Sequence, residues 1–146
     1  MPDRMLRSDA KSAVRRRTME KWAERWRSST AKLRSVTENL SLLPNLSTND
    51  RKWSRVLSRL RIGHTKLTHS YLLTGGGEPP TCEKCQSESQ ITIKHILTEC
   101  PAHLHARRRI FRRDRVSLAY LLKECDTSPT GPLAQFLTST GIINLI

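Results

Sequence analysis

The sequence predicts a mainly α protein in which small helical segments surround a Cys/His cluster. Apolar residues recur at three- and four-residue intervals along most of the chain, which is the spacing of one face of a helix. Prolines, glycines and capping residues separate these stretches into short segments. Only 36% of the 146 residues are hydrophobic, so we do not expect a large single core, and a bound metal would add stability.

The first predicted helix begins at Ser8 or Asp9, either of which can cap it, and ends near Ser29. Arg16 and Glu20 lie one turn apart on its polar face, where they can pair. The opposite face is an apolar stripe, which we expect to pack into the core, tryptophans included. This stripe consists of Val14, Thr18, Trp22 and Trp26, with Met19 beside them.

Two further helices are expected before the cluster, after a less regular stretch at 33–46 that contains Pro44. Asn49 or Asp50 can cap the first of them, and the glycines at 75–77 end the second. The apolar side of the first consists of Trp53, Val56, Leu57 and Leu60, and that of the second of Leu67, Tyr71 and Leu72.

Three cysteines and one histidine recur as Cys82-x2-Cys85-x9-His95-x4-Cys100. Zn²⁺ takes four tetrahedral ligands of these types, and a Cys-x2-Cys turn supplies two of them, so the pattern predicts a structural zinc site. Three alternatives stay open: a disulfide, a thioredoxin-like redox pair, and four unrelated side chains. A disulfide between Cys82 and Cys85 would be strained, and a redox pair requires a βαβ context, whereas this motif follows a loop rich in glycine and proline.

Pro101 shapes the chain around the last cysteine. A residue before proline is disfavoured in the helical region, so the short helix that carries His95 should end at Cys100. Pro101 suits the first turn of the next helix, which would place Cys100 at a helix N-terminus, where the dipole favours a thiolate. His103 and His105 are the second choice for the histidine ligand, because their spacing from Cys100 is cramped.

Three helices are expected after the cluster. The first has an apolar face formed by Leu104 and Phe111, and the other two fit residues 116–124 and 132–143. The opposite face of the first helix carries Arg109, Arg112 and Arg113, at positions i, i+3 and i+4. The apolar positions of the other two are Leu118, Leu121, Leu122, Leu133, Phe136, Leu137, Ile142 and Ile143.

The chain is strongly basic, with 26 Lys and Arg residues against 13 Asp and Glu and a net charge of +13. Such a charge favours a polyanionic partner, nucleic acid above all, over an anionic membrane surface. Residues 76–100 are mildly acidic, whereas the segments on both sides are basic. Because no apolar run approaches the ~20 residues of a transmembrane helix and no secretory leader is evident, we expect an intracellular protein, nuclear or cytoplasmic, that is not secreted.

Two arginine groups are the candidate phosphate contacts, with a solvated surface as the alternative for both. The group that follows the Cys/His cluster has few acidic neighbours and is the better candidate, whereas the group in the first predicted helix lies near Glu20. The first comprises Arg109, Arg112 and Arg113, and the second Arg15, Arg16 and Arg17. Three other residues are expected to be structural: His64 and His69 in helix capping or core hydrogen bonds, and Cys125 as a small buried side chain.

Two stretches of this sequence resemble a known family. One is the run Arg-Leu-Arg-Ile-Gly-His-Thr-Lys-Leu-Thr-His-Ser-Tyr-Leu-Leu at residues 59–73, and the other is the Cys/His cluster followed by Pro101. Both are similar to the C-terminal region of non-LTR retrotransposon polyproteins of the Jockey and I-like groups. In that family, this region follows a reverse transcriptase and an RNase H domain and contains a CCHC zinc-binding module. The central run joined to the CCHC spacing is quite specific, whereas the likeness at the two ends is weak.

This resemblance implies three parts: a basic helical region at 1–75 like the segment after RNase H, a CCHC zinc knuckle at 76–101, and a C-terminal helical region at 102–146. The family's reverse transcriptase is absent, and we find no converging carboxylates of the kind that hold Mg²⁺ in RNase H. We therefore expect a non-catalytic polyprotein fragment, stabilised by zinc, that binds RNA or DNA largely through phosphates. The alternative is a helical scaffold segment that docks on a missing RNase H or reverse transcriptase domain, including a remnant without function.

Overall fold

The computed structural model describes residues 7–37, 50–85 and 87–146 and confirms a mainly α protein. Helical segments dominate the described chain, which otherwise contains one sheet of two short strands. The predicted irregular stretch around Pro44 and the alternative cap Asn49 lie outside the described residues. Within the described ranges, no helix combines the length and the apolar character needed to span a membrane.

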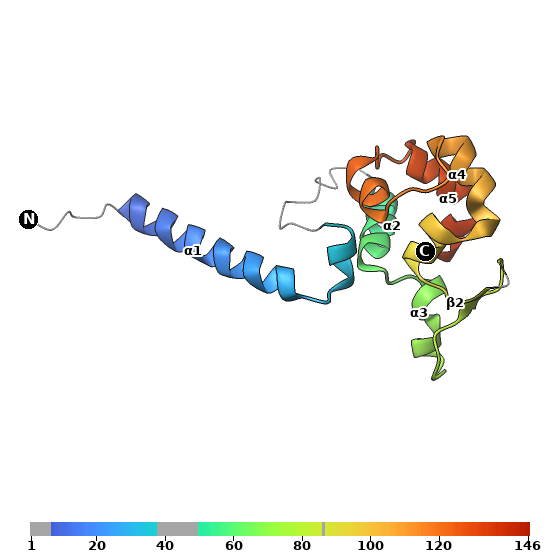
Figure 1. Cartoon of the computed structure of the whole chain (residues 1–146), viewed down its shortest axis with the longest axis horizontal. Helices are drawn as coiled ribbons and strands as arrows, with labels where there is room; N and C mark the ends of the chain where they lie inside the picture. The colour runs from blue at the N-terminus through green and yellow to red at the C-terminus, as the bar shows by residue number, and fades with distance from the viewer. Residues whose placement is uncertain (1–6, 38–49, 86) are drawn as a thin grey trace, which may run out of the picture.

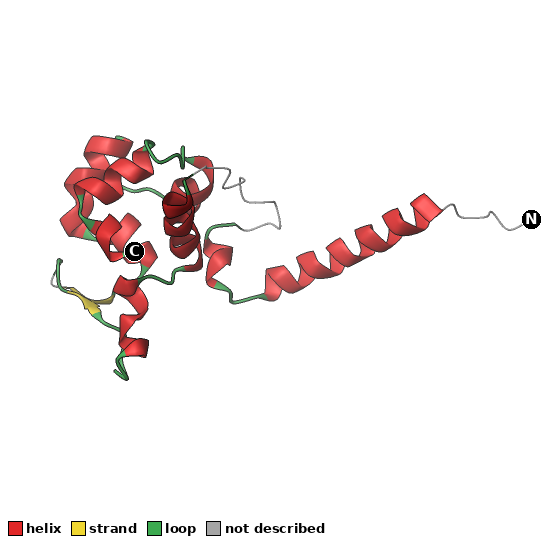
Figure 2. Cartoon of the chain, turned by 180° about the vertical axis from the view of Figure 1, so that it is seen from behind, coloured by secondary structure: helices red, strands yellow, loops and turns green. Residues whose placement is uncertain are grey.

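The first helix, α1 (Arg7–Ser28), projects away from the rest of the molecule (Figures 1 and 2). Its bounds agree closely with the predicted ones, but the prediction that its apolar stripe packs into the core is wrong. Val14 is 66% exposed and Trp22 is 55% exposed. The C-terminal end of α1 meets the body where the half-buried Trp26 donates its indole N–H to the Thr37 carbonyl at 3.3 Å. A short 3₁₀ helix, η1, follows at Lys32–Ser35.

Helix α2 (Arg51–Ile62) forms one wall of the core. Asp50, one of the two predicted caps, accepts hydrogen bonds from two backbone N–H groups of the first turn at 2.8 and 3.0 Å. The predicted apolar positions Trp53, Leu57 and Leu60 are buried, and Val56 is partly buried. The indole N–H of Trp53 donates to the Thr127 carbonyl at 2.6 Å and so ties α2 to the C-terminal part of the chain.

Helix α3 (Lys66–Leu73) follows after a turn that depends on a glycine and a threonine. Gly63 ends α2 in the left-handed region, with φ of 80°, where only glycine is free of strain. Thr65 then begins α3 in a capping box with Thr68. The helix ends just before the glycines at 75–77, as the sequence predicts. The run at 59–73 therefore contains the end of α2 and the whole of α3.

The Cys/His segment is a short hairpin followed by a tight helical turn. Strands β1 (Thr81–Cys82) and β2 (Ser87–Gln90) pair antiparallel and lie near α3 in both views (Figures 1 and 2). A π-helical turn, η2 (His95–Glu99), then ends at Cys100, whose ψ of 119° is not helical. The predicted end of this helix before Pro101 is therefore confirmed.

After Cys100 the chain continues through a short 3₁₀ helix, η3 (Pro101–His103), into α4 (Leu104–Phe111). Helix α4 ends at Phe111 because Arg112 adopts the left-handed conformation, with φ of 56°. The predicted helical face of three arginines is therefore wrong, since Arg112 and Arg113 both lie beyond the end of α4.

The C-terminal part completes the body with η4 (Tyr120–Glu124), α5 (Pro132–Ser139) and η5 (Ile142–Leu145). Helix α4 packs on α5, and α2 packs on η4. The single helix predicted at 132–143 is divided because Gly141 takes a left-handed conformation, with φ of 72°. One apolar core joins these segments and runs from Val36 to Ile146, so the hairpin is inserted between two stretches that share the same core.

Candidate metal centre

Three short elements bring the four predicted ligands together. Cys82 ends β1, Cys85 lies in the hairpin turn, His95 begins η2, and Cys100 precedes η3. One ligand atom from each residue lies within 4.8 Å of the ligand atoms of the other three. Segments separated by up to eighteen residues thus converge on one point, and the arrangement is a candidate metal site.

The distances within the cluster match those around a tetrahedral ion. The Sγ atoms of Cys82 and Cys100 are 3.9 Å apart, and the Cys85 Sγ lies 3.4 Å from the His95 Nε2. Metal–sulfur bonds of about 2.3 Å and metal–nitrogen bonds of about 2.0 Å place two sulfurs about 3.8 Å apart, and a sulfur and a nitrogen about 3.5 Å apart. These two distances are therefore those expected for ligands of one tetrahedral metal ion.

Neither the disulfide nor the thioredoxin-like redox pair fits this geometry. A disulfide requires two sulfurs at about 2.05 Å, whereas all four cysteines of the chain are free. The Cys-x2-Cys turn lies in a two-stranded antiparallel hairpin and not in the βαβ unit of thioredoxin-like proteins.

Burial makes this a closed site. Cys82, His95 and Cys100 are at most 6% exposed, and Cys85 is half-buried. Four protein ligands complete a tetrahedron, as in structural metal sites, whereas catalytic sites keep one position for water.

The π-helical turn sets the spacing of the last two ligands. The Cys100 N–H donates to the His95 carbonyl at 2.6 Å, which closes a five-residue turn, and the Thr92 hydroxyl accepts from the His95 N–H at 3.0 Å. Ile96 and Leu97 on the other side of this turn are buried in the core. The ligands are therefore anchored to the apolar core through η2.

The protonation of Cys100 differs from the prediction. The pKa of the Cys100 thiol is raised to about 11, mainly by burial and also by the neighbouring Cys82, while a hydrogen bond from the Ala102 N–H acts in the opposite direction. The expected effect of the helix N-terminus on the Cys100 pKa is therefore present but weaker than desolvation, which favours the neutral thiol. A bound cation would reverse this balance, because metal binding displaces the thiol proton.

One residue that supports the cluster was missed by sequence reasoning. Arg107 is 2% exposed, and its Nη2 donates to the Cys100 carbonyl at 2.7 Å. Its Nε and Nη1 have no partner among the described residues. Burial lowers the pKa of Arg107, while its interaction with Cys100 raises it. Its position, three residues after Leu104 and four before Phe111, places it on the apolar face of α4 and was the signal that could have revealed it.

The second-choice ligands lie outside the cluster. His103 is buried, and its ring meets the edge of Phe136 at a centroid distance of 6.1 Å. Burial lowers its pKa, and the positive charges of Lys84 and Arg107 lower it further. His105 is exposed on α4. Neither histidine belongs to the group of residues whose ligand atoms converge.

The structure separates the two candidate arginine groups. Arg15, Arg16 and Arg17 are exposed on α1, and within the described residues none forms an ion pair, the possible pairing of Arg16 with Glu20 included. In the other group, Arg109 and Arg112 line a common surface hollow beside α5, whereas the Arg113 guanidinium lies over the ring of Tyr120, 5.3 Å from its centroid.

The remaining predicted residues are structural. The rings of His64 and His69 stack at 3.6 Å, and the His69 Nδ1 lies 2.7 Å from the Thr68 hydroxyl. The cap of α3 comes from Thr65 and not from either histidine. Cys125 is buried as predicted, and burial raises its pKa.

Comparison of the chain with models of protein families, with curated proteins and with solved structures found no match.

Proposed function

We propose that this chain is a zinc-stabilised, non-catalytic module that binds RNA or DNA largely through phosphates, in the C-terminal region of a non-LTR retrotransposon polyprotein. The sequence resemblance supports the source, and the Cys/His cluster supports the metal. Three thiols and one imidazole are a ligand set that favours zinc over magnesium or calcium, which prefer oxygen.

The observation that carries the nucleic-acid proposal is the charge and position of α1. Its 22 residues contain eight Lys and Arg against three Asp and Glu. The helix extends into solvent away from the body (Figures 1 and 2). A projecting basic helix offers unpaired cations to a phosphate backbone on several sides, and the release of counterions then drives binding. The exposed Arg15, Arg16 and Arg17 therefore replace Arg109, Arg112 and Arg113 as the leading phosphate contacts.

The non-catalytic part of the proposal rests on the chemistry of the clusters. Among the described residues, Cys82, Cys85, His95 and Cys100 form the one group of at least three metal-binding side chains that converge. A closed site of this kind holds a fold together, because it leaves no position at which an ion could activate water.

A salt titration of binding tests the proposal. Affinity for a short duplex, measured by fluorescence anisotropy, should fall with salt with a slope of about −0.9 per neutralised phosphate. Replacing Arg15, Arg16 and Arg17 by alanine should weaken binding to all sequences and flatten this slope by up to ~3 units. The matched control replaces the same residues by lysine, which keeps the charge and should keep the slope. Binding by the alanine variant that equals that of the parent chain at every salt concentration would contradict the proposal.

A helical scaffold function is the second candidate, and one observation favours it. The same helix exposes Val14, Met19 and Trp22, so α1 also presents apolar surface to a partner such as an RNase H or reverse transcriptase domain. The same titration separates the two, because a scaffold segment would show no binding to the duplex even at low salt.

A further inference from the structure

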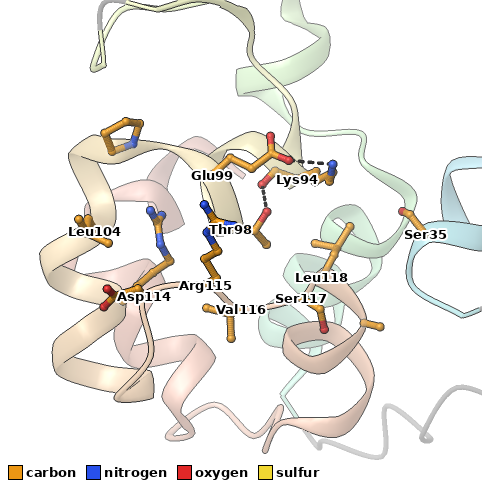
Figure 3. Close-up of a pocket in the computed structure, with 13 residues that line it drawn as sticks. Ser35, Lys94, Thr98, Glu99, Leu104, Asp114, Arg115, Val116, Ser117 and Leu118 are labelled. Carbon is orange, nitrogen blue, oxygen red and sulfur yellow. Dashed lines mark hydrogen bonds and ion pairs between the residues drawn. The ribbon is translucent and has the colours of Figure 1, made fainter.

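A cavity of about 940 Å³ opens to solvent beside the Cys/His cluster, between η2, α4 and the segment that leads into η4 (Figure 3). Glu99 and Pro101, the neighbours of Cys100 in the chain, contribute to its lining. Apolar side chains such as Leu104 and Val116 form part of its walls, and charged and hydroxyl groups form the rest. The cavity is much larger than one water molecule requires, so it has room for a polyatomic ligand.

The charges that line this cavity do not balance. Glu99 is already paired with Lys94 at 2.7 Å. Asp114 is already paired with Arg108, whose Nη2 donates to its Oδ2 at 2.8 Å. Figure 3 shows the Lys94–Glu99 pair on one side of the cavity and Arg115 reaching toward it from the segment before η4. Arg115 and Arg107 also line the cavity, and neither forms an ion pair with a described residue.

The burial of Arg107 makes this excess of positive charge unfavourable in free energy. Arg107 is 2% exposed, and two of its nitrogens lack hydrogen-bond acceptors within the described chain. A buried guanidinium without a counter-charge loses its hydration energy with little compensation. An anion in the cavity would offset this cost, because Coulomb attraction is stronger near a poorly solvated charge.

Groups with direct access to such an anion stand at the mouth of the cavity. Arg115 is exposed and offers a planar fork of N–H donors. The Ser117 hydroxyl accepts a hydrogen bond from the Tyr120 N–H at 3.1 Å, so its own proton is available for donation. Arginine and hydroxyl donors together suit the several oxygens of a phosphate group.

We propose that this cavity binds a phosphate group, held by Arg115 and Ser117 and stabilised by the buried positive charge of Arg107. That the phosphate belongs to a nucleic-acid strand rests on the proposed function. The site would bring a strand that contacts α1 into contact with the metal-stabilised body as well, so that binding involves two parts of the molecule.

The first test uses inorganic phosphate. Titration of the full chain, followed by NMR of the arginine Nε–Hε groups, should shift the signals of Arg115 and Arg107 saturably, whereas chloride at equal ionic strength should not. Arg115→Ala should weaken phosphate binding roughly tenfold, because it removes charge-assisted hydrogen bonds. The matched control is Arg55→Ala, which removes an exposed arginine of α2 outside the cavity and should leave binding unchanged.

The second test repeats the comparison with a short oligonucleotide and separates this inference from the proposed function. If phosphate shifts the NMR signals of both arginines but the oligonucleotide does not bind at low salt, the phosphate site is supported and the proposed function is wrong. If the oligonucleotide binds but Arg115→Ala behaves like Arg55→Ala and phosphate causes no shift, the cavity proposal is wrong and the proposed function stands. Saturable shifts with an acidic peptide and none with phosphate would overturn the assignment of the ligand as phosphate.

Discussion

At the scale of single residues, Arg107 couples the metal cluster to the body of the protein. Its side chain donates a hydrogen bond to the carbonyl of one ligand, Cys100, and is itself 2% exposed. Arg107 therefore supports the backbone at one ligand of the candidate site through a hydrogen bond.

Arg107→Met tests this role, since methionine keeps much of the side-chain volume and removes the charge and the donor. We expect zinc affinity to fall roughly tenfold or more, as is typical when an outer-shell partner of a metal ligand is lost. Competition with a chelator measures this change. Arg109→Met on the exposed face of the same helix is the matched control and should retain the parent affinity. If the two variants bind zinc equally well, Arg107 does not support the metal.

The protonation of Cys100 predicts the dependence of zinc binding on pH. Because its pKa is raised to about 11 without metal, Cys100 is protonated at pH 7 and must lose a proton when zinc binds. Protons therefore compete with the metal, and apparent affinity should rise with pH by at least tenfold per unit between pH 6 and 8. Chelator competition at several pH values, corrected for the chelator's own protonation, checks this slope. An affinity that does not change with pH would contradict the assignment of Cys100 as a thiolate ligand.

The ligand set illustrates what a sequence reveals at this scale. Spacing alone pointed to Cys82, Cys85, His95 and Cys100, because a knuckle and a helix end place ligands at short, characteristic intervals. Spacing could not show that Cys100 is fully buried, and burial depends on distant segments of the core. The direction of its pKa shift was therefore missed.

At the scale of the elements, local chemistry set the helix ends where a capping side chain or a glycine was available. Asp50 caps α2, and Gly63 with Thr65 makes the turn to α3. The end of α4 was not predictable in this way, since Arg112 adopts a left-handed conformation that the residue type disfavours. The packing of the C-terminal part holds that conformation, and no local pattern encodes it.

The start of α5 offers a sharp test at this scale. An added Cβ at Gly131 would lie 2.4 Å from the Asp126 carbonyl oxygen, which is a clash with backbone. Gly131→Ala should therefore lower the free energy of unfolding by about 1–3 kcal/mol, the usual cost of overpacking. Urea unfolding followed by circular dichroism measures this. Gly77→Ala is the control, because a Cβ there meets nothing within 4 Å. Equal stability of the two variants would show that the loop before α5 adapts freely.

At the scale of the whole molecule, the chain divides into a body that contains the Cys/His cluster and a projecting basic helix. The periodicity of α1 correctly predicted a helix but wrongly predicted that its apolar stripe is buried. A stripe shows that a helix has an apolar face, and only the tertiary structure shows whether another element covers it. Here the core is built from residues between Val36 and Ile146, and no described residue of α1 belongs to it.

The central claim is that a zinc ion bound by Cys82, Cys85, His95 and Cys100 stabilises this body, and native mass spectrometry tests it most directly. The parent chain should carry one Zn²⁺. Cys82→Ser should lose the ion and the hairpin structure around it, while the matched variant Cys125→Ser, which alters the one cysteine outside the cluster, should retain both. Stoichiometric zinc in the double variant Cys82→Ser, Cys85→Ser, or a metal-free parent chain that still folds at saturating zinc, would contradict the account.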